Sequence, residues 1–384
     1  MDANKMKPET IAAQALGWID ETTKAVSPPI HMSTTYVRDT DNQYRNGRVY
    51  ARDHNPSFDQ VEAVLCALEH GAQAALFASG MAAATALFQA LKPNDHVIAP
   101  KVMYWSLRNW LMNFATHWGL QVEFIDVHDL SQLRRAMQPG KTRLVWIETP
   151  ANPLWTITDI AAAAEIAHTA GALLAVDSTA ASPVLTRPLT LGADIVMHSA
   201  TKYLNGHSDV IAGALVTRED SEYWKRVKMV RAQIGGTMGS FEAWLLLRGM
   251  RTLFLRVDAA CRSAARIAAH FQGHAQIAEV LYPGLTGFAG HTTAARQMHG
   301  GFGGMLSIRL KAGEAAAIAT AAHVQLWKRA TSLGGVESLI EHRASVEGAG
   351  TPVPFDLLRL SVGIENTDDL IADLEQALKR VAAA

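Results

Sequence analysis

Cysteine is scarce in this sequence: only Cys66 and Cys261 occur among its 384 residues. Two cysteines are too few for a disulfide framework, and their spacing is not that of a metal site, so a reducing cytoplasm is the expected location. Neither sign of charge dominates, since 35 Lys plus Arg against 36 Asp plus Glu give a net charge of −1. This balance excludes the basic excess typical of proteins that bind nucleic acid or anionic membranes.

Long apolar runs are also missing. The first 18 residues contain no apolar signal core, and no uncharged apolar stretch of about 18 residues could span a bilayer. No histidine pattern with a nearby carboxylate indicates a metal centre, so we expect none. Because 49% of the residues are hydrophobic, the chain can still bury a large core. We therefore expect a soluble cytoplasmic protein with neither nucleic acid nor a membrane as partner.

Two changes of texture divide the chain into three parts. Residues 1–58 are polar and lack a sustained helical period, so they are expected to form an arm that packs on something else. Over residues 59–240 short apolar runs alternate with helical patterns, which predicts an α/β fold with a mainly parallel sheet and helices on both faces. Residues 241–384 are expected to form a smaller α+β domain. The apolar runs are AALFA (74–78), HVIAP (96–100), VEFIDV (122–127), RLVWIE (143–148), LLAVD (173–177), DIVMHS (194–199) and GALVT (213–217).

The carboxyl ends of these predicted strands are the first places to look for function, because open parallel sheets gather functional groups there. After AALFA, Ser79-Gly80-Met81 opens a helix whose free N–H groups suit a phosphate. LLAVD ends on Asp177, and DIVMH is followed by Ser199-Ala200-Thr201-Lys202. Each feature alone also fits a plain turn, a helix cap or a surface charge. Together, an amine, a carboxylate, hydroxyls and helix N–H groups are what an aldehyde cofactor with a phosphate and a protonated pyridine requires.

One longer run carries a specific resemblance. HSATKYLNGHSDVIAGALV (198–216) is similar to the pyridoxal-phosphate lysine signature of the Cys/Met-metabolism family, which contains cystathionine γ-synthase, cystathionine γ- and β-lyases, methionine γ-lyase and the acylhomoserine sulfhydrylases. The resemblance covers nearly the whole chain and implies a fold type I pyridoxal-phosphate enzyme. Further segments that follow the family order are SPPIHMSTTY, YARDHNPS, FASGMAA, ETPANP, AVDSTAASP, GGFGGMLS, TSLGGVESLI and LLRLSVGIE.

The resemblance implies pyridoxal 5'-phosphate as the cofactor and assigns it a set of positions. Lys202 would be the catalytic Schiff-base lysine, and Asp177 the partner of the pyridine nitrogen. Tyr104 would stack on the cofactor ring and assist proton transfer. The phosphate would be held by Gly80, Met81, Ser199 and Thr201.

The family pattern also implies a neighbouring subunit and a substrate. Tyr50 and Arg52, in a Tyr-x-Arg motif, would reach the phosphate of a neighbouring subunit, which implies a homo-oligomer of active-site dimers and commonly a tetramer. The substrate would be a small amino acid. Its α-carboxylate would be held by Asn152, Ser332 and Arg359, where a two-donor guanidinium is the natural partner.

Three positions depart from the family pattern. Thr331 stands where the synthases and γ-lyases for cystathionine usually carry Glu, so a carboxylate that could bind a distal ammonium is missing. Trp105 places an indole beside the stacking tyrosine, and Ser178 replaces the usual Asn after the aspartate. The residues assigned to the cofactor match the family pattern, whereas the positions around the substrate depart from it. The identity of the leaving group therefore stays open.

We therefore expect a lyase or transferase that performs γ-elimination or γ-replacement on an amino acid of homoserine or homocysteine type, at a carbon–sulfur or carbon–oxygen bond. β-Elimination ranks lower, because cystathionine β-lyases resemble Tyr-Ser-Trp where this chain has Thr331-Ser332-Leu333. A non-catalytic cofactor-binding protein is a further alternative, against which the complete Lys, Asp, Tyr and Arg set argues. A dinucleotide oxidoreductase is excluded because no G-x-G-x-x-G follows the early strands.

Overall fold

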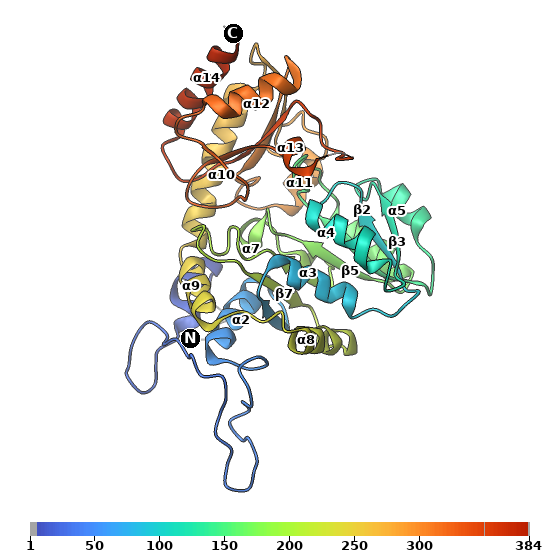
Figure 1. Cartoon of the computed structure of the whole chain (residues 1–384), viewed down its shortest axis with the longest axis vertical. Helices are drawn as coiled ribbons and strands as arrows, with labels where there is room; N and C mark the ends of the chain where they lie inside the picture. Colours follow the sequence, from blue (N-terminus) through green and yellow to red (C-terminus); the bar gives the residue numbers. More distant parts are fainter. Residues whose placement is uncertain (1–5, 349, 383–384) are drawn as a thin grey trace.

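Seven short strands form the larger of two sheets in the computed structural model, which describes residues 6–348 and 350–382 (Figure 1). Their order is β1-β7-β6-β5-β4-β2-β3; β7 runs antiparallel to β1 and β6, and the other neighbours are parallel. The strands are β1 Gln73–Phe77, β2 His96–Pro100, β3 Gln121–Ile125, β4 Thr142–Glu148, β5 Leu173–Asp177, β6 Ile195–His198 and β7 Gly213–Thr217. The seven apolar runs of the sequence coincide with them to within two residues at either end, so the predicted mainly parallel sheet is confirmed.

Helices cover both faces of this sheet because its strands are apolar on both sides. Three of them pack into one hydrophobic cluster: α2 Pro56–Glu69, α5 Leu130–Ala136 and α6 Ile160–Thr169. Three others pack into the cluster on the opposite face: α3 Gly80–Gln89, α4 Trp105–Trp110 and α8 Glu222–Ile234. The remaining helical segments up to β7 are short: α7 Ser182–Leu185 and single turns at Ala15–Gly17, Leu111–Ala115 and Pro188–Leu191.

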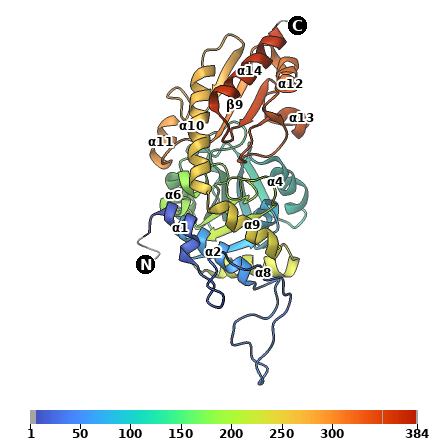
Figure 2. The same cartoon turned by 90° about the vertical axis from the view of Figure 1, so that its left-hand side faces the viewer.

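A second sheet of five strands makes up the C-terminal part, with the order β10-β11-β12-β9-β8. Its strands are β8 Ile277–Leu281, β9 Met305–Leu310, β10 Lys328–Arg329, β11 Leu339–His342 and β12 Leu357–Ser361. The helices of this part are α9 Ser240–Met250, α10 Leu253–Phe271, α11 His291–Gln297, α12 Gly313–His323, α13 Arg343–Glu347 and α14 Thr367–Ala382. The helices α10, α12 and α14 pack on the sheet around a third hydrophobic cluster (Figure 2). Among the described residues, no helix combines the length and the apolar character needed to cross a membrane.

The N-terminal segment projects from the body of the molecule (Figures 1 and 2). From residue 18 to residue 54 no side chain is buried, and the backbone forms one isolated bridge, between Thr35 and Tyr50. Helices occupy both ends of the region expected to form the arm. Helix α1 (Pro8–Gln14) precedes the extended stretch and buries Ile11 and Ala12 in the main core, and α2 begins at Pro56. A seven-residue helix is too short to reveal a helical period in the sequence.

Candidate active site

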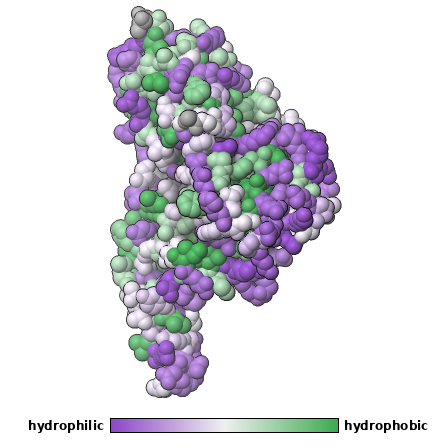
Figure 3. Space-filling view, turned by 45° about the vertical axis from the view of Figure 1, so that its right-hand side comes forward, coloured by the Kyte–Doolittle hydropathy of each residue, from purple (hydrophilic) through white to green (hydrophobic). Residues whose placement is uncertain are grey.

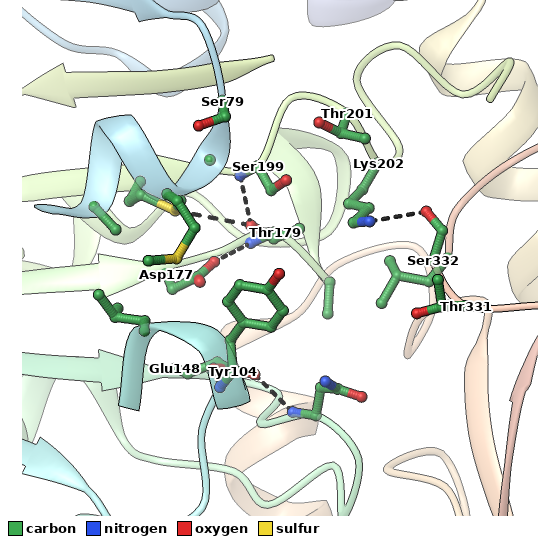
Figure 4. A pocket seen from close by; sticks show the side chains of 18 of the residues that line it. Ser79, Tyr104, Glu148, Asp177, Thr179, Ser199, Thr201, Lys202, Thr331 and Ser332 are labelled. Atoms are coloured by element: carbon green, nitrogen blue, oxygen red, sulfur yellow. Dashed lines mark hydrogen bonds between the residues drawn. The ribbon is translucent and has the colours of Figure 1, made fainter. Parts of the chain in front are cut away.

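The carboxyl ends of β4, β5 and β6 and the first turn of α3 surround a cavity of about 330 Å³. The C-terminal sheet contributes its other wall through β12 and the loop before β11 (Figure 4). Tyr50 and Arg52 lie outside it, on the projecting segment, with the Arg52 guanidinium carbon 5.3 Å from the centre of the Tyr50 ring. The other residues predicted from the sequence line the cavity together: Gly80, Met81, Tyr104, Asn152, Asp177, Ser199, Thr201, Lys202, Ser332 and Arg359.

The N-terminus of α3 forms a compact polar corner of the cavity. Ser79 Oγ accepts the N–H of Ala82 at 3.0 Å, which starts the helix at Gly80 directly after β1. The first N–H groups of a helix have no partner within it and suit an anion. A Cβ built on Gly80 would lie 2.8 Å from both Cβ and Oγ of Ser199, so the close approach of the helix to that serine requires glycine.

Asp177 ends β5 and is almost fully buried, with 8% of its surface exposed. One of its oxygens accepts the N–H of Thr179 at 3.0 Å, and Thr179 Oγ1 accepts the N–H of Ser199 at 2.8 Å. Burial raises the pKa of Asp177, and the hydrogen bonds from Thr179 oppose this effect. A cationic group beside this carboxylate would offset the cost of burying its charge.

Lys202 points across the cavity toward the C-terminal part (Figure 4). Its Nζ donates to Ser332 Oγ at 2.8 Å. Burial, together with the positive charges of Arg359 and Arg343, lowers the pKa of Lys202 to about 8, while Glu341 acts in the opposite direction. The amine is therefore far more often neutral near physiological pH than an exposed lysine, as a nucleophile or a base requires.

Arg359 on β12 reaches from the C-terminal sheet to the larger one and is 4% exposed. Its Nη1 donates to Asn152 Oδ1 at 3.1 Å and its Nη2 to the Ser332 carbonyl at 2.8 Å. Glu341, directly opposite on β11, lies 2.5 Å from Arg359 Nη2 and also accepts from Arg343 Nη1 at 3.1 Å. The guanidinium is thus held in one orientation at the cavity wall.

Sequence reasoning assigned no role to three cavity residues that the structure brings forward. Arg343 lines the cavity from α13. Thr179 links Asp177 to Ser199. Glu148, the last residue of β4, accepts the N–H of Tyr104 at 2.7 Å and that of Asn152 at 2.8 Å. The position of Glu148 at the end of the buried run RLVWIE was the available signal, because Asp177 was found in the same way.

The residues present fit a phosphorylated pyridine aldehyde. The start of α3 and the hydroxyl of Ser199 supply donors for a phosphate, and Thr201 lies beside them with its hydroxyl donating to the Ala212 carbonyl at 3.1 Å. Asp177 supplies a buried carboxylate for a ring proton, and Lys202 supplies an amine of lowered pKa for the aldehyde. All of them line one cavity, so the class of site is that of a pyridoxal-phosphate enzyme.

The chain belongs to the family described as Cys/Met metabolism PLP-dependent enzyme, whose model matches residues 9–379. The cystathionine gamma-synthase of Mycobacterium tuberculosis is 45% identical over 377 residues, which cover 97% of this chain and 96% of that protein. The L-methionine gamma-lyase of Pseudomonas deceptionensis is 40% identical over 380 residues, which cover 94% of each. The crystal structure of metB from Corynebacterium glutamicum is 40% identical, has a TM-score of 0.95, and the match covers 99% of this chain and 100% of that one.

These similarities confirm three expectations from the sequence. The chain is a member of the Cys/Met-metabolism family, its fold is that of fold type I pyridoxal-phosphate enzymes, and its cofactor is pyridoxal 5'-phosphate. It is an enzyme of a family that acts on amino acids.

Proposed function

We propose that this enzyme performs γ-elimination or γ-replacement on an amino acid of homoserine or homocysteine type. The observation that carries the proposal is the meeting, in one cavity, of the Lys202 amine with the Arg359–Asn152 pair. That pair offers a guanidinium and an amide to a substrate carboxylate, and the amine lies on the Ser332 side of it. An α-amino acid bound there would present its Cα to a base.

The proposed roles follow from these contacts. Arg359 and Asn152 hold the substrate α-carboxylate, and Ser332 orients both the guanidinium and the Lys202 amine. Lys202 takes the proton from Cα. A second proton is then lost from Cβ, which expels the γ-substituent, and Tyr104 assists these proton transfers. When bound, pyridoxal phosphate supplies the electron sink for this carbanion chemistry. Asp177 holds its ring proton, and its phosphate is held by Gly80, Met81, Ser199 and Thr201.

We further propose a homo-oligomer, built of dimers that share sites and assembled as a tetramer, in which the arm of residues 1–58 brings Tyr50 and Arg52 to a neighbour's phosphate. Residues 59–240 would be the cofactor-binding domain and residues 241–384 the C-terminal domain. Exposed apolar side chains support the assembly: Val37 on the arm is 91% exposed, and Ile211 lines the cavity yet is 68% exposed. Figure 3 shows hydrophobic surface on the body beside the arm, as an interface requires. A cytoplasmic location remains our proposal from the scarcity of cysteine.

A substrate panel tests the reaction. L-Cystathionine, L-methionine and an O-acyl-L-homoserine, the last with and without L-cysteine, are incubated with the purified enzyme. Release of 2-oxobutanoate and ammonia indicates γ-elimination, and formation of cystathionine indicates γ-replacement. Lys202→Ala is the control and should be inactive, because it removes the base. Pyruvate and homocysteine as the main products of cystathionine would instead establish β-elimination and overturn the γ-assignment.

A further inference from the structure

Glu148 occupies a central position in the cavity wall without facing solvent. It ends β4, is 7% exposed, and pairs in register with Asp177 on β5. Burial raises the pKa of Glu148, with the negative charge of Asp177 adding to the effect. A buried carboxylate beside a second one is costly, so it persists only where its hydrogen bonds compensate.

Those hydrogen bonds go to two backbone amides on separate loops. One oxygen of Glu148 accepts the N–H of Tyr104, the residue that precedes α4, at 2.7 Å. The other oxygen accepts the N–H of Asn152, in the turn after β4, at 2.8 Å. Both oxygens are thus occupied by backbone N–H donors, which is an arrangement for holding loops rather than for exchanging protons with a substrate.

One of these loops carries Tyr104, which is proposed to contact the cofactor ring, and the other carries Asn152, which is proposed to contact the substrate α-carboxylate. Tyr104 presents its ring to the cavity, and Asn152 passes the contact on, because its Oδ1 accepts from Arg359 Nη1 at 3.1 Å. Arg359 in turn belongs to the C-terminal sheet. The Glu148 side chain therefore fixes the backbone at Tyr104 and the backbone at Asn152 at the same time (Figure 4).

We propose that Glu148 is a positioning residue that sets Tyr104 and the Asn152–Arg359 pair in register for a substrate bound on the cofactor. This inference rests on the proposed function, because it assumes that the Asn152–Arg359 pair receives a substrate α-carboxylate. In this role Glu148 acts through Tyr104 and Asn152 and itself touches neither substrate nor cofactor. Its loss would misplace both groups while leaving Lys202 and Asp177 in place.

Two variants separate positioning from general stability. Glu148→Gln keeps one acceptor oxygen but turns an amide NH₂ toward the second backbone N–H, so one loop loses its anchor. Glu148→Ala removes both anchors. Asp373→Asn is the matched control: Asp373 is 7% exposed and accepts the N–H groups of Gln325, Leu326 and Trp327, but it lies in the C-terminal helix α14 away from the cavity.

The readout is binding rather than turnover. Full-length protein freed of cofactor is titrated calorimetrically with phosphopyridoxyl-L-alanine and with phosphopyridoxyl-ethylamine, stable reduced adducts that differ by the α-carboxylate. The ratio of their dissociation constants reports the Asn152–Arg359 pair, and the affinity for the ethylamine adduct reports the ring contact of Tyr104. For Glu148→Gln we expect either the preference for the carboxylate-bearing adduct or the affinity for the ethylamine adduct to fall about tenfold, equivalent to about 1.4 kcal/mol. For Glu148→Ala we expect both the preference and the affinity to fall. Asp373→Asn should lower the thermal midpoint without changing either.

The outcomes distinguish the inference from the function on which it rests. If the unaltered protein binds neither adduct, the proposed function fails, and the inference fails with it. If the unaltered protein prefers the carboxylate-bearing adduct and Glu148→Gln keeps both the ratio and the ethylamine affinity, the positioning role is overturned alone. Equal losses of adduct affinity in Glu148→Gln and Asp373→Asn would also overturn the positioning role, because they would show that Glu148 contributes only to general stability.

Discussion

Replacing Lys202 by Met in the cofactor-free protein should flatten the pH dependence of its folding stability. Burial, with the positive charges of Arg359 and Arg343, lowers the pKa of Lys202 from 10.5 to about 8. In the unfolded chain the amine regains its ordinary pKa, so the unfolded state binds more protons than the folded state between these two values. The free energy of unfolding therefore rises with pH across this window.

The size of the effect follows from the two pKa values. Each pKa unit corresponds to about 1.36 kcal/mol, so the protonated amine costs the folded state about 3 kcal/mol below both values. About 2 kcal/mol of this cost disappears between about pH 7.5 and about pH 10. Lys202→Met removes the cost at every pH, while the other titrating groups are common to both proteins and cancel in the comparison.

Urea unfolding of both cofactor-free proteins at the two pH values measures this difference. The unaltered protein should gain about 2 kcal/mol more than Lys202→Met on going from the lower to the higher pH. Parallel pH profiles for the two proteins would refute the reasoning, because they would mean that the amine titrates alike in the folded and unfolded chains.

Two further predictions concern specificity and assembly. Thr331→Glu should shift preference toward cystathionine over O-acyl-homoserine in a kcat/KM competition. Because Thr331 is exposed, a new ion pair there is worth at most about 1 kcal/mol, or about fivefold, and the neutral Thr331→Gln should show no shift. Mixing Arg52→Ala with Lys202→Ala subunits should restore activity that neither has alone, because hybrid dimers contain one site with both residues. A mixture that stays inactive although the subunits exchange would contradict a shared site.

The larger sheet was predictable because its strands are buried on both faces. HVIAP, LLAVD and GALVT are short runs that are apolar except for one terminal residue each, and each forms a strand with the same bounds. Turn chemistry fixed the start of α3 equally well, since Ser79 is a capping side chain before Gly80. Once the strands are known, the convergence of Asp177 and Lys202 follows from the rule that parallel strands end at one edge.

Contacts between distant segments could not be predicted in this way. Nothing in the spacing shows that Glu148 binds two backbone amides, since its partners depend on how two loops fold back. Arg343 forms ion pairs with Glu341 and Glu347, which are close to it in the sequence, but the packing of its short helix against the cavity is a tertiary feature. The placement of Tyr50 and Arg52 against a second subunit stays a prediction, because it concerns another copy of the chain.

Arg359 reaches from the C-terminal sheet to Asn152, so two separate stretches of the chain line the cavity. The positions assigned to the cofactor precede residue 203, whereas Thr331, Ser332 and Arg359 come from the last sixty residues. Three residues of that late segment also act on the Lys202 amine: Ser332 accepts its hydrogen bond, and the charges of Arg343 and Arg359 lower its pKa. Directed evolution of specificity in this enzyme is therefore best begun at Thr331, with Ser332, Arg343 and Arg359 retained.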